Sequence, residues 1–395
     1  MTGYCTEDLL MKTINKSLTI KEYAAIVMIL LSSGTAYFYM FHAGLTLLSL
    51  FFIASLVAIC NKAKLHYNSF SIIYGVLILT NVLLYGSNLS LIGDVLFLIS
   101  TLFITSSFSF DAFRKGLLNV VLALSVISLF LYILYIFNIV TPSLQGVGKN
   151  GLEGYYLYAF HVFGGGHYIA MHYKVCGLFW EPGIYQMVLN ICLLMNLDLL
   201  DRRSLINMRK MKLSIIIITV LLIQSTTGYL VLGTIIVGYY LNKSQNSVKF
   251  KIITLISAII FGIVIMLSPV VTDKFSMDNR SFIVRANDFI GLSYAIFERP
   301  LTGLGVGSKV FEQVSDKLGM TSSLSAGILL QTAQFGLLWI ITFYYSLVKE
   351  FRKRAIKLPV YVYVIVVTFL GIGEPLAFSP LFLINVLPFN RYENG

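Results

Sequence analysis

The sequence predicts an all-α integral membrane protein whose single domain, residues 1–395, crosses the bilayer about ten to twelve times. Three observations lead to this fold class. The chain is 57% hydrophobic, only 12% of its residues are charged, and long apolar runs alternate with short basic linkers. Soluble globular proteins carry about 25% charged residues, so this chain has too few charges to cover a surface that faces water. The scattered cysteines predict free thiols rather than a disulfide framework.

The predicted membrane helices follow the apolar runs, each long enough to span a bilayer. The first run lacks the small-residue cleavage site of a signal peptide, so we expect it to remain as a helix. The runs lie at residues 23–41, 43–60, 70–86, 91–109, 116–140, 184–200, 213–241, 251–268, 326–348 and 358–388.

Two of these runs contain a break. Basic clusters flank 213–241 on both sides, so the chain must leave and return within it, yet two full crossings need roughly 20 residues each. The polar stretch Gln224–Gly228 therefore predicts two short helices that meet inside the membrane, which requires surrounding protein or a wet cavity. The run 358–388 is broken in the same way at Gly371–Pro375. Twelve helices result if each broken run is a hairpin, and ten if each is one span.

Basic residues set the predicted orientation. Lysine and arginine clusters mark the linkers that we expect to be cytoplasmic, together with both termini. Two much longer segments, 141–183 (loop 1) and 269–325 (loop 2), then lie on the outer side. Loop 2 also contains lysines and arginines, but the linkers one span away on each side are denser in them. We therefore expect loop 2 to remain outside.

Loop 2 contains a predicted amphipathic helix. Asp278 or Asn279 can cap a helix that runs to about Phe297. Apolar residues recur every seven positions along it, which suits a helix lying at a membrane surface. Pro300 and the glycines of the stretch 303–307 then predict a flexible turn, whose spacing does not match a nucleotide-binding loop.

Two arginines stand at the start of this helix. Cations oppose the helix dipole at such a position, so local stability does not favour Arg280 and Arg285 there. An anionic ligand would reverse that effect, because helix amides and guanidiniums together bind a phosphate or diphosphate well. The alternative is that both arginines bind lipid headgroups or pair with Asp278 and Asp288.

Loop 1 ends in the stretch CGLFWEPG, residues 176–183. Pro182 suits the first turn of a helix, and the dipole favours a carboxylate beside that N-terminus. Glu181 is therefore either a structural cap or arginine partner, or an acid that faces a polar cavity as a general base or sugar-binding group. A second acid, Glu374, lies inside an apolar run and is a site candidate for that reason, with a buried structural hydrogen bond as the alternative.

Histidines precede the CGLFWEPG stretch. His161, His167 and His172 lie around a run of three glycines, and their spacing fits no standard zinc pattern. We therefore predict no metal, and we assign His167 and His172 to contacts with sugar or to plain loop structure. The neighbouring tyrosines could stack on sugars or form an interfacial belt.

Two motifs resemble the bacterial O-antigen polymerase and ligase family. KVCGLFWEPG, 174–183, is similar to the family pattern of a basic residue, two others, and then G-L-F-x-E-P. RANDFIGLSYAIFERPLTGLGVGS, 285–308, is similar to the family's arginine-led surface helix that ends in P-L-x-G-x-G. The remainder of the chain is matched by its hydropathy pattern and its two long loops.

The chain departs from the family pattern at two places. Lys174 stands where the family commonly has arginine, which allows a point-charge contact with phosphate but not a bidentate one. Family ligases place a histidine just before the span that follows loop 2, whereas TSSLSAGILLQTAQFG, 321–336, contains none. This absence favours the polymerase branch.

The resemblance implies a metal-independent, inverting glycosyltransferase of the C-type, without a cofactor, at the periplasmic face of the bacterial inner membrane. Its donor would be an oligosaccharide on undecaprenyl diphosphate, and its acceptor the terminal sugar of another lipid-linked repeat unit. Membrane lipids and a chain-length regulator protein are the other expected partners, and nucleic acid is not one. Arg285, Arg280 and Lys174 would bind the diphosphate, and Glu181 would take the acceptor proton. The broken segments near Thr226 and Glu374 would shape the cavity for the lipid.

Two alternatives stay open. An O-antigen ligase, which transfers the chain to the lipid A core, would share every one of these motifs. A flippase for lipid-linked oligosaccharides would be a transporter, a class that commonly shows paired repeats. The sequence shows no clear repeat, and its two long loops also argue against a transporter.

Overall fold

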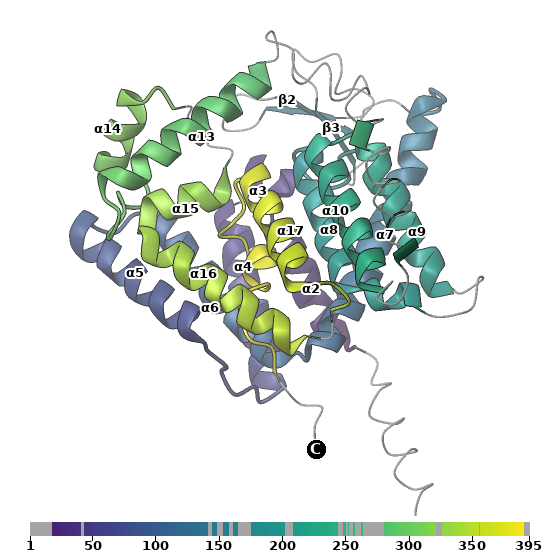
Figure 1. The fold of residues 1–395 in the computed structure, drawn as a ribbon, viewed down its shortest axis with the longest axis horizontal. Helices are drawn as coiled ribbons and strands as arrows, with labels where there is room; N and C mark the ends of the chain where they lie inside the picture. The colour runs from purple at the N-terminus through teal and green to yellow at the C-terminus, as the bar shows by residue number, and fades with distance from the viewer. Residues whose placement is uncertain are drawn as a thin grey trace, which may run out of the picture.

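The computed structural model describes residues 18–40, 43–140, 144–147, 153–157, 161–164, 175–201, 208–243, 248–249, 252, 256, 262–263, 280–320, 326–354 and 356–390. Helices form most of the regular structure in these ranges, as predicted (Figure 1). A small sheet in the described part of loop 1 consists of three short antiparallel strands that pair in the order β1-β2-β3. The hydropathy pattern did not predict this sheet.

The helices and strands have the following bounds. They are α2 Ile20–Ser32, α3 Ala36–Met40, α4 Ala43–Cys60, α5 Ser69–Tyr85, α6 Leu89–Ser107, α7 Phe110–Ile136, β1 Leu144–Val147, β2 Glu153–Leu157, β3 His161–Gly164, α8 Pro182–Met195, the 3₁₀ helix η3 Leu197–Asp201, α9 Met208–Ile223, α10 Thr226–Lys243, α13 Arg280–Glu298, α14 Lys309–Lys317, α15 Gly327–Phe335, α16 Leu337–Lys353, α17 Val360–Gly373 and α18 Pro380–Leu383.

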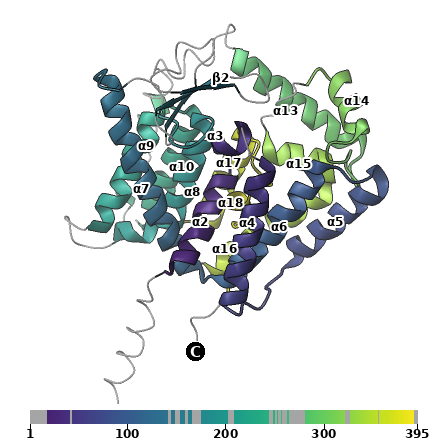
Figure 2. The ribbon, with the colours of Figure 1, turned by 180° about the vertical axis from the view of Figure 1, so that it is seen from behind.

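Among the described residues, three helices, α4, α6 and α7, are long and apolar enough to cross a membrane. The outward side of α4 shows why lipid suits them. Leu45, Leu48 and Phe52 are 58%, 60% and 62% exposed, and large apolar side chains at such exposure are stable against hydrocarbon rather than water. These helices therefore indicate association with a membrane. Seen from behind, α2, α4 and α6 pack side by side (Figure 2).

Helix starts in this group are set by short polar side chains. Asn68 accepts a hydrogen bond from the Ser71 amide at the start of α5, and Asn88 accepts one from the Leu91 amide at the start of α6. Each side chain satisfies an amide that has no partner within its helix. The two helices consequently begin close to the predicted positions 70 and 91.

Several predicted runs are divided in the structure. The predicted break in 213–241 is confirmed, because α9 ends at Ile223, Gln224 has a φ of 55° and α10 begins at Thr226. The predicted break in 358–388 is confirmed where α17 ends at Gly373. Two further breaks were not predicted: α2 and α3 are separated around Gly34, and α15 and α16 around Gly336. Most of the run 251–268 lies outside the described residues.

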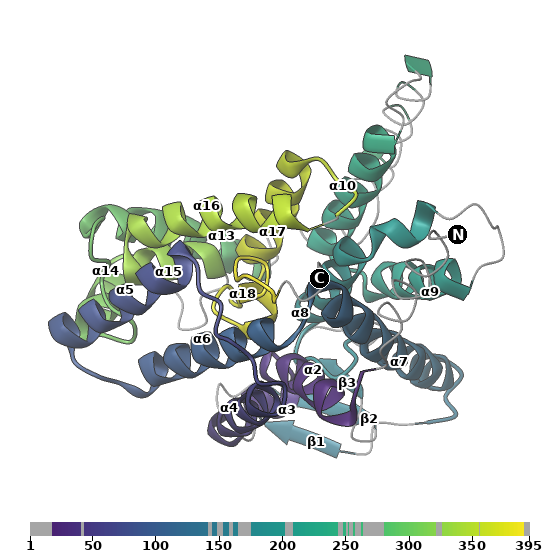
Figure 3. The same cartoon turned by 90° about the horizontal axis from the view of Figure 1, so that it is seen from below.

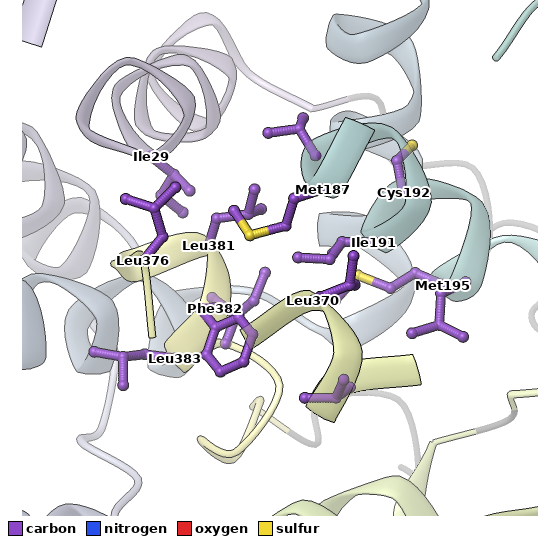
Figure 4. Packing of buried hydrophobic residues seen from close by; sticks show 14 of the residues in the cluster. Ile29, Met187, Ile191, Cys192, Met195, Leu370, Leu376, Leu381, Phe382 and Leu383 are labelled. Carbon is purple, nitrogen blue, oxygen red and sulfur yellow. The ribbon is translucent and has the colours of Figure 1, made fainter. Parts of the chain in front are cut away.

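Helix α8 forms the centre of the fold. Every one of its residues except Gly183 is buried, and it packs against α7, α9 and α10 (Figures 1 and 3). On its remaining side, Met187 and Ile191 lie beside Leu370, Leu376 and Leu381, which come from α17, α18 and the segment between them (Figure 4). The N-terminus of α8 is therefore held by a tightly packed core.

A second, smaller core lies under α13. Leu292 and Ala295 are fully buried there together with Ala333 of α15. On the opposite side of α13, Tyr294 and Phe297 are 63% and 76% exposed. One face of α13 thus packs on protein while the other presents apolar side chains outward. The predicted end of this helix near Phe297 is confirmed.

The described cysteines are free thiols, as predicted. Cys60 is exposed, whereas Cys176 and Cys192 are buried.

Candidate functional site

Arg285 connects α13 to the main bundle. Its Nη1 atom donates a hydrogen bond to the carbonyl oxygen of Gly373 over 3.0 Å, and its Nη2 atom lies 3.9 Å from Oε1 of Glu374. The Glu374 side chain is 1% exposed, whereas that of Arg285 is 30% exposed. A partly open guanidinium is therefore held against a buried carboxylate.

The electrostatic position of Arg285 differs from the predicted one. Helix α13 begins at Arg280, so Arg285 lies in the second turn, beyond the first turn in which the dipole acts strongly. Its guanidinium instead caps the C-terminal carbonyl of α17, where a cation is favoured. The prediction that local structure disfavours Arg285 is wrong for this reason.

Arg280 is the first residue of α13, and its side chain lies outside the described part of the structure. Its assignment to the diphosphate therefore stays a prediction.

The carboxylate of Glu374 lies on the first turn of α8. A Cβ atom at Gly183 would overlap Oε1 of Glu374 and approach its Cδ atom to 2.7 Å. Only glycine leaves room for this contact. The N-terminus of a helix favours a nearby anion, so α8 stabilises the charge of the buried acid.

The N-terminal ends of two other helices, α15 and α10, lie at the same place. The amide of Gly327, the first residue of α15, donates to the carbonyl oxygen of Glu374 over 3.2 Å. A Cβ at Gly373 would lie 2.9 Å from Cγ2 of Thr227, which belongs to the first turn of α10. We define the Glu374 site as Gly183, Thr227, Arg285, Gly327, Gly373 and Glu374. Both predicted breaks, near Thr226 and near Glu374, contribute to it.

Glu181 precedes this cluster by two residues and is the N-cap of α8. Its carbonyl oxygen accepts from the amides of Ile184 and Tyr185, but its side chain makes no capping hydrogen bond. Glu181 is therefore the cap residue that the sequence allowed, through its backbone and without a side-chain hydrogen bond. The segment before it is fixed to the break between α2 and α3, because the amide of Trp180 donates to the carbonyl of Gly34 over 3.2 Å. The partly buried carboxylate of Glu181 makes no ion pair with the described residues.

Three predicted site residues, Lys174, His167 and His172, lie outside the described residues. Their assignment to substrate binding stays a prediction. In the described ranges, no three histidine, cysteine, aspartate or glutamate side chains come together as a metal site requires.

Buried polar groups inside the helices were not predicted. Gln186 and Asn190 of α8 are completely buried and bonded to each other over 2.9 Å. Asp94 of α6 is 5% exposed, and its Oδ2 atom has no hydrogen-bond partner among the described residues. The available signal was a polar residue inside an apolar run, as for Glu374.

The segment Pro300–Gly307, which we call the glycine brace, is not the flexible turn that the sequence predicts. The amides of Leu304 and Gly305 donate to the carbonyls of Ala333 and Gln334 at the end of α15. The hydroxyl of Tyr85 donates to the carbonyl of Gly303 over 2.6 Å. Leu304 and Val306 are 1% and 5% exposed. The prediction is wrong because distant elements supply the hydrogen bonds that fix this segment.

Glycine is required in the brace by close approach. Gly303 and Gly305 have φ values of 68° and 86°, and a Cβ on Gly303 would overlap the backbone of Gln334. A Cβ on Gly305 would overlap the ring of Tyr85. Gly336, at the break between α15 and α16, has a φ of 87°. A Cβ on Gly336 would overlap the backbone of the brace at Leu301. The brace and this break therefore fit together as backbone against backbone.

No protein-family model, curated protein or solved structure matches this chain. The resemblance to O-antigen polymerases and ligases consequently rests on the two motifs, together with the hydropathy pattern and the two long loops.

Proposed function

We propose that this protein is a glycosyltransferase of the O-antigen polymerase type in the bacterial inner membrane. One observation carries the proposal: residues of the two motifs come together at Glu374. Gly183, the last residue of KVCGLFWEPG, contacts Glu374, and Glu374 pairs with Arg285, the first residue of the second motif. Segments that are far apart in the sequence thus build one charged site at a helix N-terminus.

The chemistry that suits this site is departure of a diphosphate. The acceptor hydroxyl attacks the anomeric carbon, the bond from that carbon to the diphosphate oxygen breaks, and negative charge grows on the leaving group. Arg285 is placed to neutralise that charge, because its guanidinium is partly exposed and uses one hydrogen bond to the described residues. Arg280 and Lys174 are the further cations that we assign to the same diphosphate, so that no metal or cofactor is required.

The acceptor must lose a proton during this attack. Glu181 is the proposed base, because its carboxylate is partly exposed and not used as a cap. His167 and His172, in the same loop, are assigned to the sugar. Attack from the side opposite to the diphosphate inverts the anomeric centre.

The lipid partners follow from the apolar surfaces. Three helices are long enough to span the bilayer, and the exposed apolar face of α13 suits the outer leaflet. We propose a multi-pass protein with both termini in the cytoplasm and loops 1 and 2 in the periplasm. Donor and acceptor would then be repeat units on undecaprenyl diphosphate, and a chain-length regulator would be a protein partner.

The test is polymerisation by purified protein in liposomes that contain lipid-linked repeat units from the cells that make it. We expect a ladder of products without lipid A core and without added metal. The Arg285→Ala variant should give no ladder, whereas Lys309→Ala, which removes an exposed cation from α14, should give the wild-type ladder.

Three outcomes would contradict the proposal. A normal ladder from Arg285→Ala would exclude a role for this arginine in binding diphosphate. Transfer to lipid A core alone would identify a ligase. Movement of lipid-linked sugar across the bilayer without a new glycosidic bond would identify a transporter.

A further inference from the structure

Glu374 is too deeply buried to bind a ligand directly. Its side chain is 1% exposed, and the Arg285 side chain beside it is 30% exposed. A ligand that reaches this place meets the guanidinium before the carboxylate. We propose that Gly183 and Glu374 form a positioning relay, in which α8 fixes the carboxylate and the carboxylate orients Arg285 toward an anionic ligand. The identity of that anion as a lipid diphosphate rests on the proposed function.

The first step of the relay is the contact at Gly183. Because the Glu374 carboxylate lies where a Cβ would be, its position is set by the backbone of α8. That backbone is fixed, since every other residue of α8 is buried. The helix N-terminus also favours an anion at this place. Glu374 is thus a rigidly placed carboxylate.

The second step is the long ion pair with Arg285. The separation of 3.9 Å is within reach of charge attraction but beyond hydrogen-bond length. The described residues accept one hydrogen bond from this guanidinium, at the carbonyl of Gly373, and a guanidinium has five N–H donors. The relay therefore orients Arg285 without using the donors that an incoming phosphate needs.

The relay makes a compensation test possible. Gly183→Ala should push the carboxylate away from α8 and disturb Arg285. Glu374→Asp shortens the side chain by one methylene group and should relieve the overlap. The double variant Gly183→Ala/Glu374→Asp should therefore be closer to wild type than Gly183→Ala alone. Gly75→Ala in α5 is the matched control, because its Cβ would meet nothing within 4 Å.

The position of Arg285 can be read without any substrate. Phenylglyoxal modifies exposed arginines, and peptide mass spectrometry gives the rate at each position. We expect Glu374→Gln and Gly183→Ala to raise the rate at Arg285 about fivefold, as for loss of a partly exposed ion pair. The double variant should restore most of the wild-type rate. Arg299, exposed just after the end of α13, is the internal control and should react equally in all variants.

A second measurement separates positioning from a merely structural role. In the ladder assay, we expect Glu374→Gln to lower kcat about fivefold while the KM for the lipid-linked donor stays within about twofold, since Arg285 acts on charge that develops in the transition state. Should Gly183→Ala fail to fold, Glu374→Gln keeps the shape of the side chain and carries both measurements.

The outcomes distinguish the relay from the proposed function. Unchanged modification of Arg285 in Glu374→Gln would overturn the relay even if the wild-type protein makes a ladder. The relay would also be overturned if the effects of Gly183→Ala and Glu374→Asp on the modification rate of Arg285 simply add in the double variant. Faster modification of Arg285 in a protein that makes no ladder would support the relay and overturn the lipid diphosphate as its ligand.

Discussion

The Glu374 site and the glycine brace both connect loop 2 to the helical bundle, and they do so by different means. In the brace, uncharged backbone packs against backbone, and Leu304 and Val306 are buried. In the Glu374 site, a buried carboxylate and a partly exposed guanidinium meet at helix ends. Glycine permits close approach in both, to a carbonyl in the brace and to a carboxylate in the site.

This difference separates a segment with a structural role from a segment with a chemical role. A segment whose contacts are uncharged and buried holds the fold, while one that keeps a charged group partly open can also act on a ligand. Changes in the brace should therefore remove folded protein, and changes in the site should remove activity from protein that still folds.

The largest expected effect is at Arg285. Arg285→Ala should lower the rate of polymerisation about 1000-fold, as removal of one donor to a developing charge does in other enzymes. Arg285→Lys should also be strongly impaired, because an ammonium cannot reproduce the guanidinium geometry. Ladder formation by purified protein measures the rate, and the melting temperature should stay near that of Lys309→Ala. A large fall in melting temperature would show that Arg285 holds the fold, as the brace does.

Gly303→Ala should have the largest effect in the brace. The new Cβ would overlap the backbone of Gln334 at a φ of 68°, and we expect a loss of about 3 kcal/mol in stability. Thermal unfolding in detergent measures the loss. Gly319→Ala is the matched control, because Gly319 has a φ of 61° with nothing within 4 Å of its Cβ. Equal losses in the two variants would show that backbone strain, and not close approach, holds the brace.

Glu181→Gln should slow the reaction about 100-fold if Glu181 is the base that takes the acceptor proton. Stability should not change, because the side chain makes no capping hydrogen bond. Ladder formation by purified protein measures kcat, and the melting temperature checks that the variant folds. A variant that keeps the wild-type kcat would remove Glu181 from the role of base.

Tyr85→Phe should have the smallest effect. It removes the hydroxyl that donates to the carbonyl of Gly303 over 2.6 Å, which should cost about 1 kcal/mol. The melting temperature should fall slightly, and the ladder from the remaining folded protein should be unchanged. An altered ladder would mean that the brace and the Glu374 site are coupled.

Sequence patterns predicted the features that depend on neighbouring residues. The apolar runs gave the helices, and the polar stretch at Gln224 and the glycines before Glu374 gave two of the breaks. The break at Gly336 was missed because a lone glycine is compatible with a helix in an apolar run. At this break the amide of Leu337 donates to the carbonyl of Pro300, a partner that the sequence alone does not bring near.

The candidate site was predicted as separate pieces. Arg285, Glu181 and Glu374 were each selected for a local reason, such as a charge beside a helix end or inside an apolar run. Their arrangement depends on Gly183, whose missing side chain gives no signal by itself. The brace was misjudged for a related reason, since glycine indicates freedom in a sequence even where distant carbonyls remove it.

The pairing of Arg285 with Glu374 also has a consequence for how the chain is made. Gly183 and Arg285 leave the ribosome well before Glu374, so α8 and α13 are synthesised before the counter-charge arrives. During that interval the guanidinium has neither the carbonyl of Gly373 nor the carboxylate as partner. The end of α17 and the residue after it supply both, so a chain that stalls before this helix lacks these two partners of Arg285.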